Sequence, residues 1–411
     1  MVSDMTGAAG GPAGMVSPDA GVSTPARDAS LLERALFEVK RVIVGQDRMV
    51  ERMVVCLLAR GHCLLEGVPG VAKTLAVETL AAVAGGTFSR LQFTPDLVPA
   101  DIVGTRIYRS GSERFDTELG PVFANFVLTD EINRAPAKVQ SALLEVMAEQ
   151  QVSIGGTTYP MPQPFLVLAT QNPIESEGVY PLPEAQRDRF LMKVVVDYPT
   201  GEEEREIVYR MGVEPPVPDQ VLHPADLLRL QHSASRVFVH HALVDYVVRL
   251  VLSTRTPADH GMADVAGWVA YGASPRASLG MIAAARGLAL MRGRDYVLPQ
   301  DVLDIAPDVL RHRLVLSYDA LADGVPADHV VRRVLQTVPL PQVTPRQRSG
   351  APPAGQPTAG HQPAGGPYAP GSQRTGRGYP SDLSGPVPRQ PAPGQPPPTG
   401  GRPEESRERS A

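Results

Sequence analysis

The sequence predicts an α/β fold: a parallel sheet with flanking helices, followed by an all-helical domain. Between residues 60 and 199, short apolar runs alternate with longer helical patterns. That alternation is typical of parallel strands connected by helices on both faces of a sheet. Between residues 200 and 340, almost every apolar pattern has the period of a helix. Both chain ends are rich in Gly, Ala or Pro and show no apolar period, as in segments that bury too little apolar surface to fold.

These shifts divide the 411 residues into four expected parts. We expect a disordered leader at 1–28, the α/β core at 29–199, the helical domain at 200–344 and a disordered tail at 345–411. The tail holds 16 of the 42 prolines and carries eight Arg against four acidic residues. The rest of the chain therefore has a net charge of −9, against −5 for the whole. An acidic body argues against nucleic acid as the main partner.

Cysteine content and hydropathy indicate where the protein acts. Cys56 and Cys63 lie in apolar runs, which favours buried thiols over a disulfide framework or a metal site. The first 27 residues lack a basic stretch followed by an apolar one, unlike a secretory signal. No apolar stretch approaches the ~20 residues that a membrane span requires. We therefore expect no membrane span and a cytoplasmic location.

The elements follow from the periodicity of the apolar residues. Residues 30–59 are expected to be helical, with a break at 44–46. The other expected elements of the core are His62–Leu65, Lys73–Ala84, Phe126–Thr129, Pro136–Gln150, Phe165–Thr170, a short helix opened by Pro183, and Leu191–Val196. The expected helices of the second domain are Ala225–Leu230, His240–Leu252, Met281–Met291, Asp301–Leu310 and a last helix with an apolar face from Val330 to Val338.

A glycine-containing loop joins the first expected strand to the helix that begins at Lys73. It reads Gly67, Val68, Pro69, Gly70, Val71, Ala72, Lys73, Thr74. In a phosphate-binding loop, backbone N–H groups approach the phosphates, a lysine neutralises them and a hydroxyl ligates Mg²⁺; Lys73 and Thr74 would take these roles. The usual pattern has Gly in place of Ala72, so an ordinary strand-to-helix turn stays open on the loop alone. Only four of the 39 basic residues are lysines, which favours a specific need for Lys73.

Polar side chains follow the next two expected core strands. Asp130 and Glu131 directly follow the strand expected at 126–129, and Asn172 follows the strand expected at 165–170. Beside a phosphate loop, Asp130 would hold Mg²⁺, Glu131 would polarise the attacking water and Asn172 could help to hold that water. Each of the three is also a common turn or cap residue, so the surrounding pattern must decide.

Taken together, these residues make the chain resemble the MoxR family of AAA+ ATPases. The matching stretches keep the family's order and spacing over roughly residues 30–340, and they are Glu66–Thr74, Asp130–Pro136, Ala169–Glu175, Tyr180–Gln186, Asp188–Phe190 and Gly272–Arg276. Phosphate loops of this family commonly read Ala-Lys-Thr, which accounts for Ala72. The resemblance implies a P-loop NTPase core of the AAA+ type with a C-terminal helical lid, ATP and Mg²⁺ as ligands, and ATP hydrolysis.

The resemblance also implies roles that spacing alone does not assign. Asn172 is similar to the sensor-one residue and Arg276 to the sensor-two residue of the lid. Arg189 is similar to the arginine finger, which would reach the nucleotide of a neighbouring subunit. Arg187, two residues before Arg189, is a rival for the finger, and this chain departs there from the apolar residue that is more usual in the family. A surface ion pair stays open as the alternative for each arginine.

Other stretches resemble the family by position. Gly45 and Gln46 are similar to the segment that packs near the adenine. Residues Thr94–Gly120 resemble the helix-two insertion, and the hairpin-like stretch Gln151–Tyr159 resembles the insertion before sensor one. In AAA+ rings such insertions face the pore and contact client proteins.

The resemblance implies a chaperone-like remodelling ATPase that works in an oligomeric ring, expected to be a hexamer. The partner would be a separate protein with a von Willebrand factor A domain, because this sequence has no D-x-S-x-S signature. Three alternatives stay open: a metal-chelatase motor subunit, a DNA-acting ring ATPase, and an ATP-bound scaffold that hardly hydrolyses. The acidic body counts against DNA, and the full set of expected catalytic groups counts against the scaffold.

Overall fold

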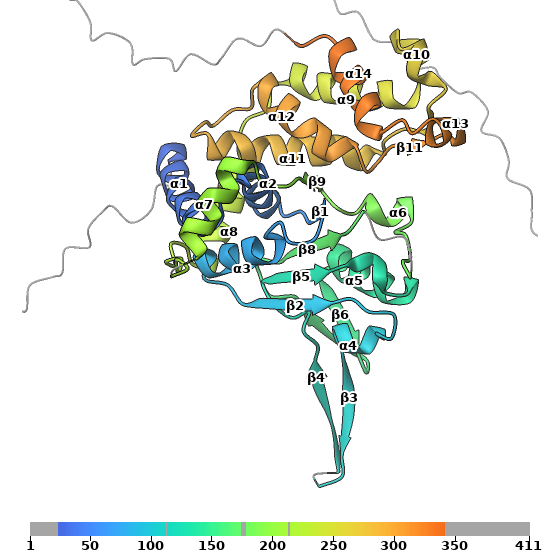
Figure 1. Ribbon diagram of the computed structural model, residues 1–411. Helices are drawn as coiled ribbons and strands as arrows, with labels where there is room; N and C mark the ends of the chain where they lie inside the picture. The colour runs from blue at the N-terminus through green and yellow to red at the C-terminus, as the bar shows by residue number, and fades with distance from the viewer. Residues whose placement is uncertain (1–23, 112, 174–177, 213, 342–411) are drawn as a thin grey trace, which may run out of the picture. The chain divides into compact units, whose positions relative to one another are not determined.

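The central sheet forms from short apolar runs. In the computed structural model, which describes residues 24–111, 113–173, 178–212 and 214–341, its strands are all parallel, in the order β2-β5-β8-β1-β9 (Figure 1). They are β1 (Cys63–Gly67), β2 (Phe88–Gln92), β5 (Phe126–Asp130), β8 (Leu166–Gln171) and β9 (Met192–Val196). The predicted parallel sheet is confirmed. Strand β2 was not predicted, because as an edge strand it carries the exposed polar residues Arg90 and Gln92.

Each face of the sheet has its own hydrophobic core. Successive strand residues point to opposite faces, so Cys63 and Leu65 of β1 join one cluster of buried side chains and Leu64 joins the other. Helices α1 (Pro25–Val42), α2 (Asp47–Leu58) and α3 (Lys73–Ala84) contribute to the first cluster. Helices α4 (Pro99–Val103) and α5 (Ala137–Glu149) contribute to the second. The parallel strands are thus covered on both sides, as the sequence predicted.

Helices dominate after residue 200, as expected. They are α7 (Gly201–Met211), α8 (Pro224–Ser235), α9 (His241–Arg255), α10 (Ala263–Ala266), α11 (Pro275–Met291), α12 (Pro299–Leu310), α13 (Tyr318–Ala322) and α14 (Ala327–Thr337). The short helices η1 (Ile132–Arg134) and α6 (Glu184–Arg187) lie before residue 200, and η2 (Ala258–His260) lies between α9 and α10. Strand β10 (Val269–Tyr271) pairs with β11 (Val315–Leu316) in a small sheet that was not predicted. The last helix ends at Thr337, so Val338 caps it rather than belonging to it.

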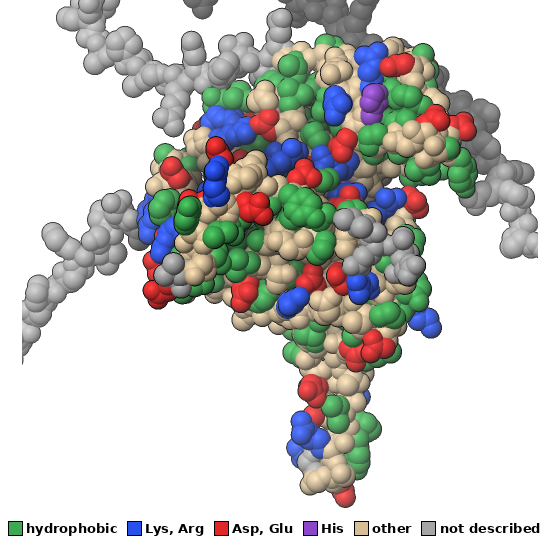
Figure 2. Space-filling view, viewed as in Figure 1, with side chains coloured by type: hydrophobic (Ala, Val, Ile, Leu, Met, Phe, Trp, Pro, Cys, Tyr) green, Lys and Arg blue, Asp and Glu red, His purple; other side chains and the backbone are tan. Residues whose placement is uncertain are grey.

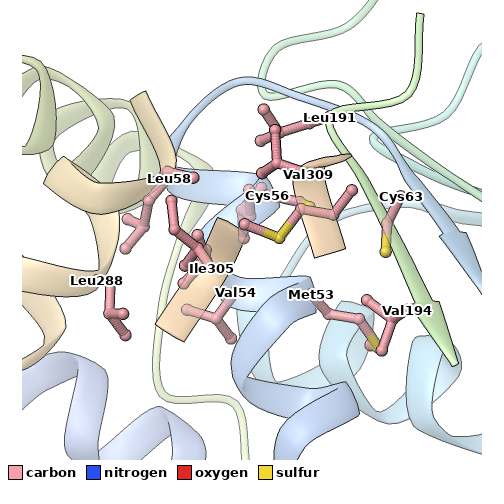
Figure 3. Packing of buried hydrophobic residues seen from close by; sticks show 14 of the residues in the cluster. Met53, Val54, Cys56, Leu58, Cys63, Leu191, Val194, Leu288, Ile305 and Val309 are labelled. Carbon is pink, nitrogen blue, oxygen red and sulfur yellow. The ribbon is translucent and has the colours of Figure 1, made fainter. Parts of the chain in front are cut away.

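The helical region and the sheet share one core. Figure 3 shows Met53 and Cys56 of α2, Val194 of β9, Leu288 of α11 and Val309 of α12 within the same cluster of buried side chains. The predicted boundary at residue 200 therefore separates two kinds of secondary structure but not two hydrophobic cores. Cys56 and Cys63 are free, buried thiols, as expected.

The N-terminal boundary of the folded part needs a correction. Helix α1 begins at Pro25 with Thr24 as its N-cap, whose hydroxyl accepts a hydrogen bond from the N–H of Arg27. Asp28 is 1% exposed and forms an ion pair with Arg229 of α8. The prediction of a leader up to residue 28 was therefore wrong for residues 24–28. Proline is favourable in the first turn of a helix, where its missing N–H costs nothing. Residues 1–23 and the predicted tail lie outside the described residues.

Two β-hairpins extend from the core. β3 (Gly104–Arg109) pairs with β4 (Arg114–Leu119), and β6 (Gln151–Ile154) pairs with β7 (Thr157–Pro160). The second pair confirms the hairpin predicted at 151–159. The first fills most of the stretch expected to be an insertion, and it projects away from the sheet (Figure 1). The hairpins touch, because Tyr159 donates a hydrogen bond to Thr117 at 3.1 Å.

The surface carries both signs of charge. On the face drawn in Figure 2, Lys and Arg side chains are interspersed with acidic and hydrophobic ones. Among the residues that the structure describes, no helix is both long and apolar enough to cross a membrane.

Candidate functional site

The loop from Gly67 to Thr74 connects β1 to α3 and has the backbone of a ligand-binding turn. A Cβ on Gly67 would lie 2.3 Å from the carbonyl oxygen of Val196, so glycine lets β1 lie close to β9. Gly70 has a φ of +82° and open space where a side chain would be. Ala72, at the position where the motif usually has glycine, has a φ of 59°. A left-handed conformation costs a non-glycine residue about 1 kcal/mol or more, so the loop holds a strained residue at the start of α3.

Lys73 is the half-buried cation of this loop. Its Nζ donates a hydrogen bond to the carbonyl oxygen of Gly67 at 2.5 Å. Burial lowers the pKa of Lys73 from its ordinary value, and nearby carboxylates, Asp130 first, oppose that shift. The ammonium group is therefore partly desolvated and faces the acids at the end of β5, in a position to neutralise an anion placed between them.

Asp130 lies at the carboxyl end of β5, beside the phosphate loop. Thr170 of β8 donates a hydrogen bond to Asp130 Oδ1 at 2.6 Å. Arg90 of β2 donates to Asp130 Oδ2 at 2.7 Å. The hydroxyl of Thr74 lies 3.5 Å from the same Oδ2. A carboxylate and a hydroxyl this close are hard oxygen donors of the kind that Mg²⁺ prefers, so the residues present fit the predicted ion.

Glu131 is held in place by its backbone as well as its side chain. Its φ of 56° is left-handed, and its N–H donates to the Thr170 hydroxyl at 2.9 Å. The carboxylate accepts a hydrogen bond from Gln92 at 3.1 Å and forms an ion pair with Arg134 at 2.9 Å. An otherwise unfavourable conformation that is maintained by two neighbouring strands is typical of functional positions.

These side chains meet in one pocket of about 350 Å³. It is lined by Pro69, Gly70, Ala72, Lys73, Thr74, Leu75, Asp130, Glu131, Thr170 and Asn172. The topology explains this convergence, because the carboxyl ends of neighbouring parallel strands meet at one edge of the sheet, where α/β proteins bind their ligands. The loop, the acid pair and Asn172, which are far apart in the sequence, therefore surround a single space.

The three predicted arginines are not among the described residues that line this pocket. Arg189 follows α6, and its guanidinium donates to the carbonyl oxygen of Leu144 at 2.8 Å. Arg187 pairs with Glu184 at 3.3 Å. Arg276, in the first turn of α11, is 59% exposed and lies 3.5 Å from Asp188. Their predicted roles toward a nucleotide therefore stay predictions.

Gly45 and Gln46 lie at the junction between α1, α2 and the start of α7. Gly45 has a φ of 75°, and a side chain there would collide with Glu203 of α7. Gln46 donates a hydrogen bond to the carbonyl oxygen of Asp197 at 3.0 Å. This segment connects the N-terminal helices to the chain that leaves β9. Its predicted place near an adenine is not tested by these contacts.

Sequence reasoning missed four residues that hold the acid pair: Arg90, Gln92, Arg134 and Thr170. Arg90 and Gln92 were missed because the edge strand β2 was not predicted, and their partners depend on the pairing of β2 with β5. Thr170 could have been found, since it lies two residues before Asn172, near the end of β8. Arg134 could also have been found, since it lies three residues after Glu131.

Comparisons with known proteins support the same interpretation. Residues 62–192 match the ATPase family associated with various cellular activities (AAA), and residues 261–334 match the AAA lid domain. The chain is 70% identical over 345 residues to Chaperone MoxR1 of Mycobacterium tuberculosis, covering 84% of this chain and 92% of that protein. It is 34% identical over 323 residues to Protein MoxR of Paracoccus denitrificans, covering 73% and 93%.

A solved structure agrees with the sequence comparisons. A candidate ATPase from Cytophaga hutchinsonii superposes with a TM-score of 0.74 at 44% identity, covering 77% of this chain and 97% of that one. The two family matches, over residues 62–192 and 261–334, include the phosphate loop, the acid pair and part of the helical region. The chain therefore belongs to the MoxR family of AAA+ ATPases.

Proposed function

We propose that the protein binds ATP with Mg²⁺ in the 350 Å³ pocket and hydrolyses it. The observation that carries the proposal is the convergence of Lys73, Thr74, Asp130 and Glu131 on one space at the carboxyl edge of the sheet. A cation and backbone N–H groups on one side and two carboxylates on the other are the groups that phosphoryl transfer requires.

Each residue then has a definite task. Lys73 neutralises charge on the β- and γ-phosphates, while Thr74 and Asp130 hold the magnesium ion. When bound, Mg²⁺ supplies positive charge to the phosphate oxygens. Glu131 orients the attacking water and accepts its proton, and Asn172 hydrogen-bonds the same water. Arg276 of the same chain and Arg189 of a neighbouring chain stabilise the charge that develops on the phosphates.

We further propose that the protein works as a ring, expected to be a hexamer, that remodels partner proteins. In its own chain Arg189 donates to the carbonyl oxygen of Leu144, and its role at the pocket of the next subunit is the one that the family resemblance implies. The name Chaperone MoxR1 of the relative at 70% identity supports a chaperone-like role. A partner with a von Willebrand factor A domain and a cytoplasmic location stay predictions from the sequence.

One pair of variants tests the central proposal. Glu131→Gln should bind ATP normally while hydrolysis falls roughly 100- to 10,000-fold, the usual contribution of general base catalysis. Lys73→Ala should lose ATP binding. The matched controls are Glu149→Gln and Lys138→Ala, since both side chains are exposed on α5, outside the pocket lining. Calorimetric binding and phosphate release are the measurements. Unchanged turnover in Glu131→Gln would remove it as the base, and absence of ATP binding by the natural protein would contradict the proposal itself.

The same Glu131→Gln variant tests assembly and partner, because it should retain bound ATP. Light scattering with ATP and Mg²⁺ should give the mass of a closed ring, and a monomer mass would contradict the ring. Proteins captured on this variant but not on Lys73→Ala identify ATP-dependent partners. A captured protein with a von Willebrand factor A domain would support the predicted partner class.

A further inference from the structure

Asp188 links two parts of the chain that carry the predicted arginines. It lies after α6, directly before Arg189, and its side chain is 16% exposed. Its carboxylate accepts hydrogen bonds from the Ser274 hydroxyl at 2.8 and 3.1 Å and from Arg313 Nε at 2.8 Å. Arg276 lies 3.5 Å from the same carboxylate. One acidic group therefore contacts the first turn of α11 and sits next to Arg189 in the chain.

Arg313 fixes the backbone on either side of Arg189. Its guanidinium donates to the carbonyl oxygens of Asp188 at 3.3 Å, Phe190 at 2.6 Å and Leu191 at 3.0 Å. The side chain is only 3% exposed. A buried guanidinium with this many acceptors is rigidly placed, so the segment that carries Arg189 cannot shift without disturbing the contact between Arg313 and Asp188.

Ser274 fixes the other side of the link. It is the N-cap of α11, and its hydroxyl accepts a hydrogen bond from the N–H of Arg276 at 3.2 Å while donating to Asp188. A displacement of Arg276 that moves the first turn of α11 would therefore pull on Asp188. Adjacent Cα atoms are about 3.8 Å apart, so movement of Asp188 is passed directly to Arg189.

We propose that Asp188 is a positioning residue that sets Arg276 and Arg189 relative to each other and thereby couples the nucleotide pockets of neighbouring subunits. The inference rests on the proposed function, in which Arg276 acts at the pocket of its own chain and Arg189 at the pocket of the next. When Arg276 engages a nucleotide, Asp188 transmits the change to Arg189. The carboxylate acts only through the two arginines and needs no contact with the nucleotide.

Asp188→Asn removes the charge and keeps the shape. Coupled pockets should give the natural protein a sigmoidal dependence of ATPase rate on ATP concentration. In Asp188→Asn we expect the rate to fall roughly 10- to 100-fold, as for a misplaced catalytic group, and the sigmoidal form to be lost. The matched control is Glu149→Gln, an exposed acid at the end of α5. It should keep the rate and the sigmoidal form. Calorimetric ATP affinity should change less than threefold in both variants, because neither residue lines the pocket.

Asp188→Asn leaves Arg313 buried without a counter-charge, which destabilises the fold. A second variant therefore tests the same link without removing a charge. Ser274→Ala keeps both charges and removes only the hydroxyl between Asp188 and α11. It should reduce cooperativity in the same way, whereas the matched cap variant Ser317→Ala, at the start of α13, should not. Hydrogen exchange on the nucleotide-free protein gives a readout independent of activity: the amide of Arg276 should exchange faster in Asp188→Asn and Ser274→Ala than in the two controls.

The outcomes separate the two proposals. If the natural protein neither binds nor hydrolyses ATP, the proposed function fails. If it hydrolyses ATP but folded Asp188→Asn and Ser274→Ala keep its rate and sigmoidal form, the inference fails and the proposed function stands. An equal loss of cooperativity in Ser274→Ala and Ser317→Ala would also overturn the inference, because it would show a general effect of helix capping.

Discussion

The pocket and the contact between α2 and α12 both contain acids paired with arginines, yet they differ in how completely those charges are enclosed. In the pocket, Asp130 is paired with Arg90, which is 51% exposed, and strained backbone holds Ala72 and Glu131. Between α2 and α12, Asp308 has no exposed surface and forms ion pairs with Arg48, Arg52 and Arg311 at 2.9, 2.8 and 3.3 Å.

The difference separates a site from a structural network. Charges that must later bind a ligand remain accessible and are held by contacts that can be exchanged. Charges that join two helices are buried and form several ion pairs each, because an unpaired buried charge is costly. Substitutions in the network should therefore change the free energy of unfolding, and substitutions in the pocket should change ligand binding.

The largest expected effect is that of Asp308→Ala. Removing this acid leaves Arg52, which is 4% exposed, without its main counter-charge. Breaking a buried pair costs about 3–5 kcal/mol, and urea unfolding measures it. The exposed pair of Asp264 with Arg333 is the control, and Asp264→Ala should have a much smaller effect. Equal losses in the two variants would show that burial of the Asp308 network does not stabilise the fold.

A second prediction concerns pH and a buried neutral side chain. His62 accepts a hydrogen bond from the N–H of Val167 on Nδ1 at 3.0 Å, and its Nε2 lies 3.2 Å from the carbonyl oxygen of Met147. Burial lowers the pKa of His62 to about 4. The unfolded chain therefore binds the proton more tightly, and stability is complete above pH 6.5 and is lost as the pH falls toward 4.

Protonation of His62 should lower the free energy of unfolding by roughly 2 kcal/mol between pH 7.5 and pH 5. Urea unfolding at the two pH values measures this loss. Burial also lowers the pKa of His312, so its contribution has the same sign. The difference between the natural protein and His62→Gln isolates one histidine, because the variant should lose that part of the pH dependence. The same pH dependence in both proteins would contradict the prediction.

The smallest expected effect is in the pocket. Arg90 donates to the oxygen of Asp130 that lies nearest Thr74, so it competes with the predicted magnesium ion. An exposed ion pair contributes at most about 1 kcal/mol, so Arg90→Gln should leave the free energy of unfolding nearly unchanged. The Mg²⁺ concentration needed for half-maximal ATP binding should fall a few-fold. Arg109→Gln, on the projecting hairpin, is the control. A rise in the Mg²⁺ requirement of Arg90→Gln would mean that Arg90 assists the ion.

Local patterns were enough to predict most of the fold. The helices around Val139 and Leu288 and the strands β5 and β8 have apolar patterns that depend only on neighbouring residues. Strand β2 was missed because its stability comes from pairing with β5, which a short polar edge segment does not reveal. The start of α1 was placed late because Pro25 resembles a linker residue, whereas its place in the first turn depends on the contacts of Asp28 with α8.

The sequence by itself determined the chemical groups of this protein: a lysine and a threonine at the start of a helix, an acid pair at the end of a strand, and the spacing of a MoxR-family chain. Only the tertiary structure decided which residues hold those groups, including Arg90, Gln92 and Thr170, and which carboxylate joins Arg189 to Arg276. The reason is physical. Periodicity depends on residues a few positions apart. The hydrogen bonds across parallel strands, and those between α11 and the segment after α6, join residues about 40 to 90 positions apart. They exist only once the sheet and the shared core have formed.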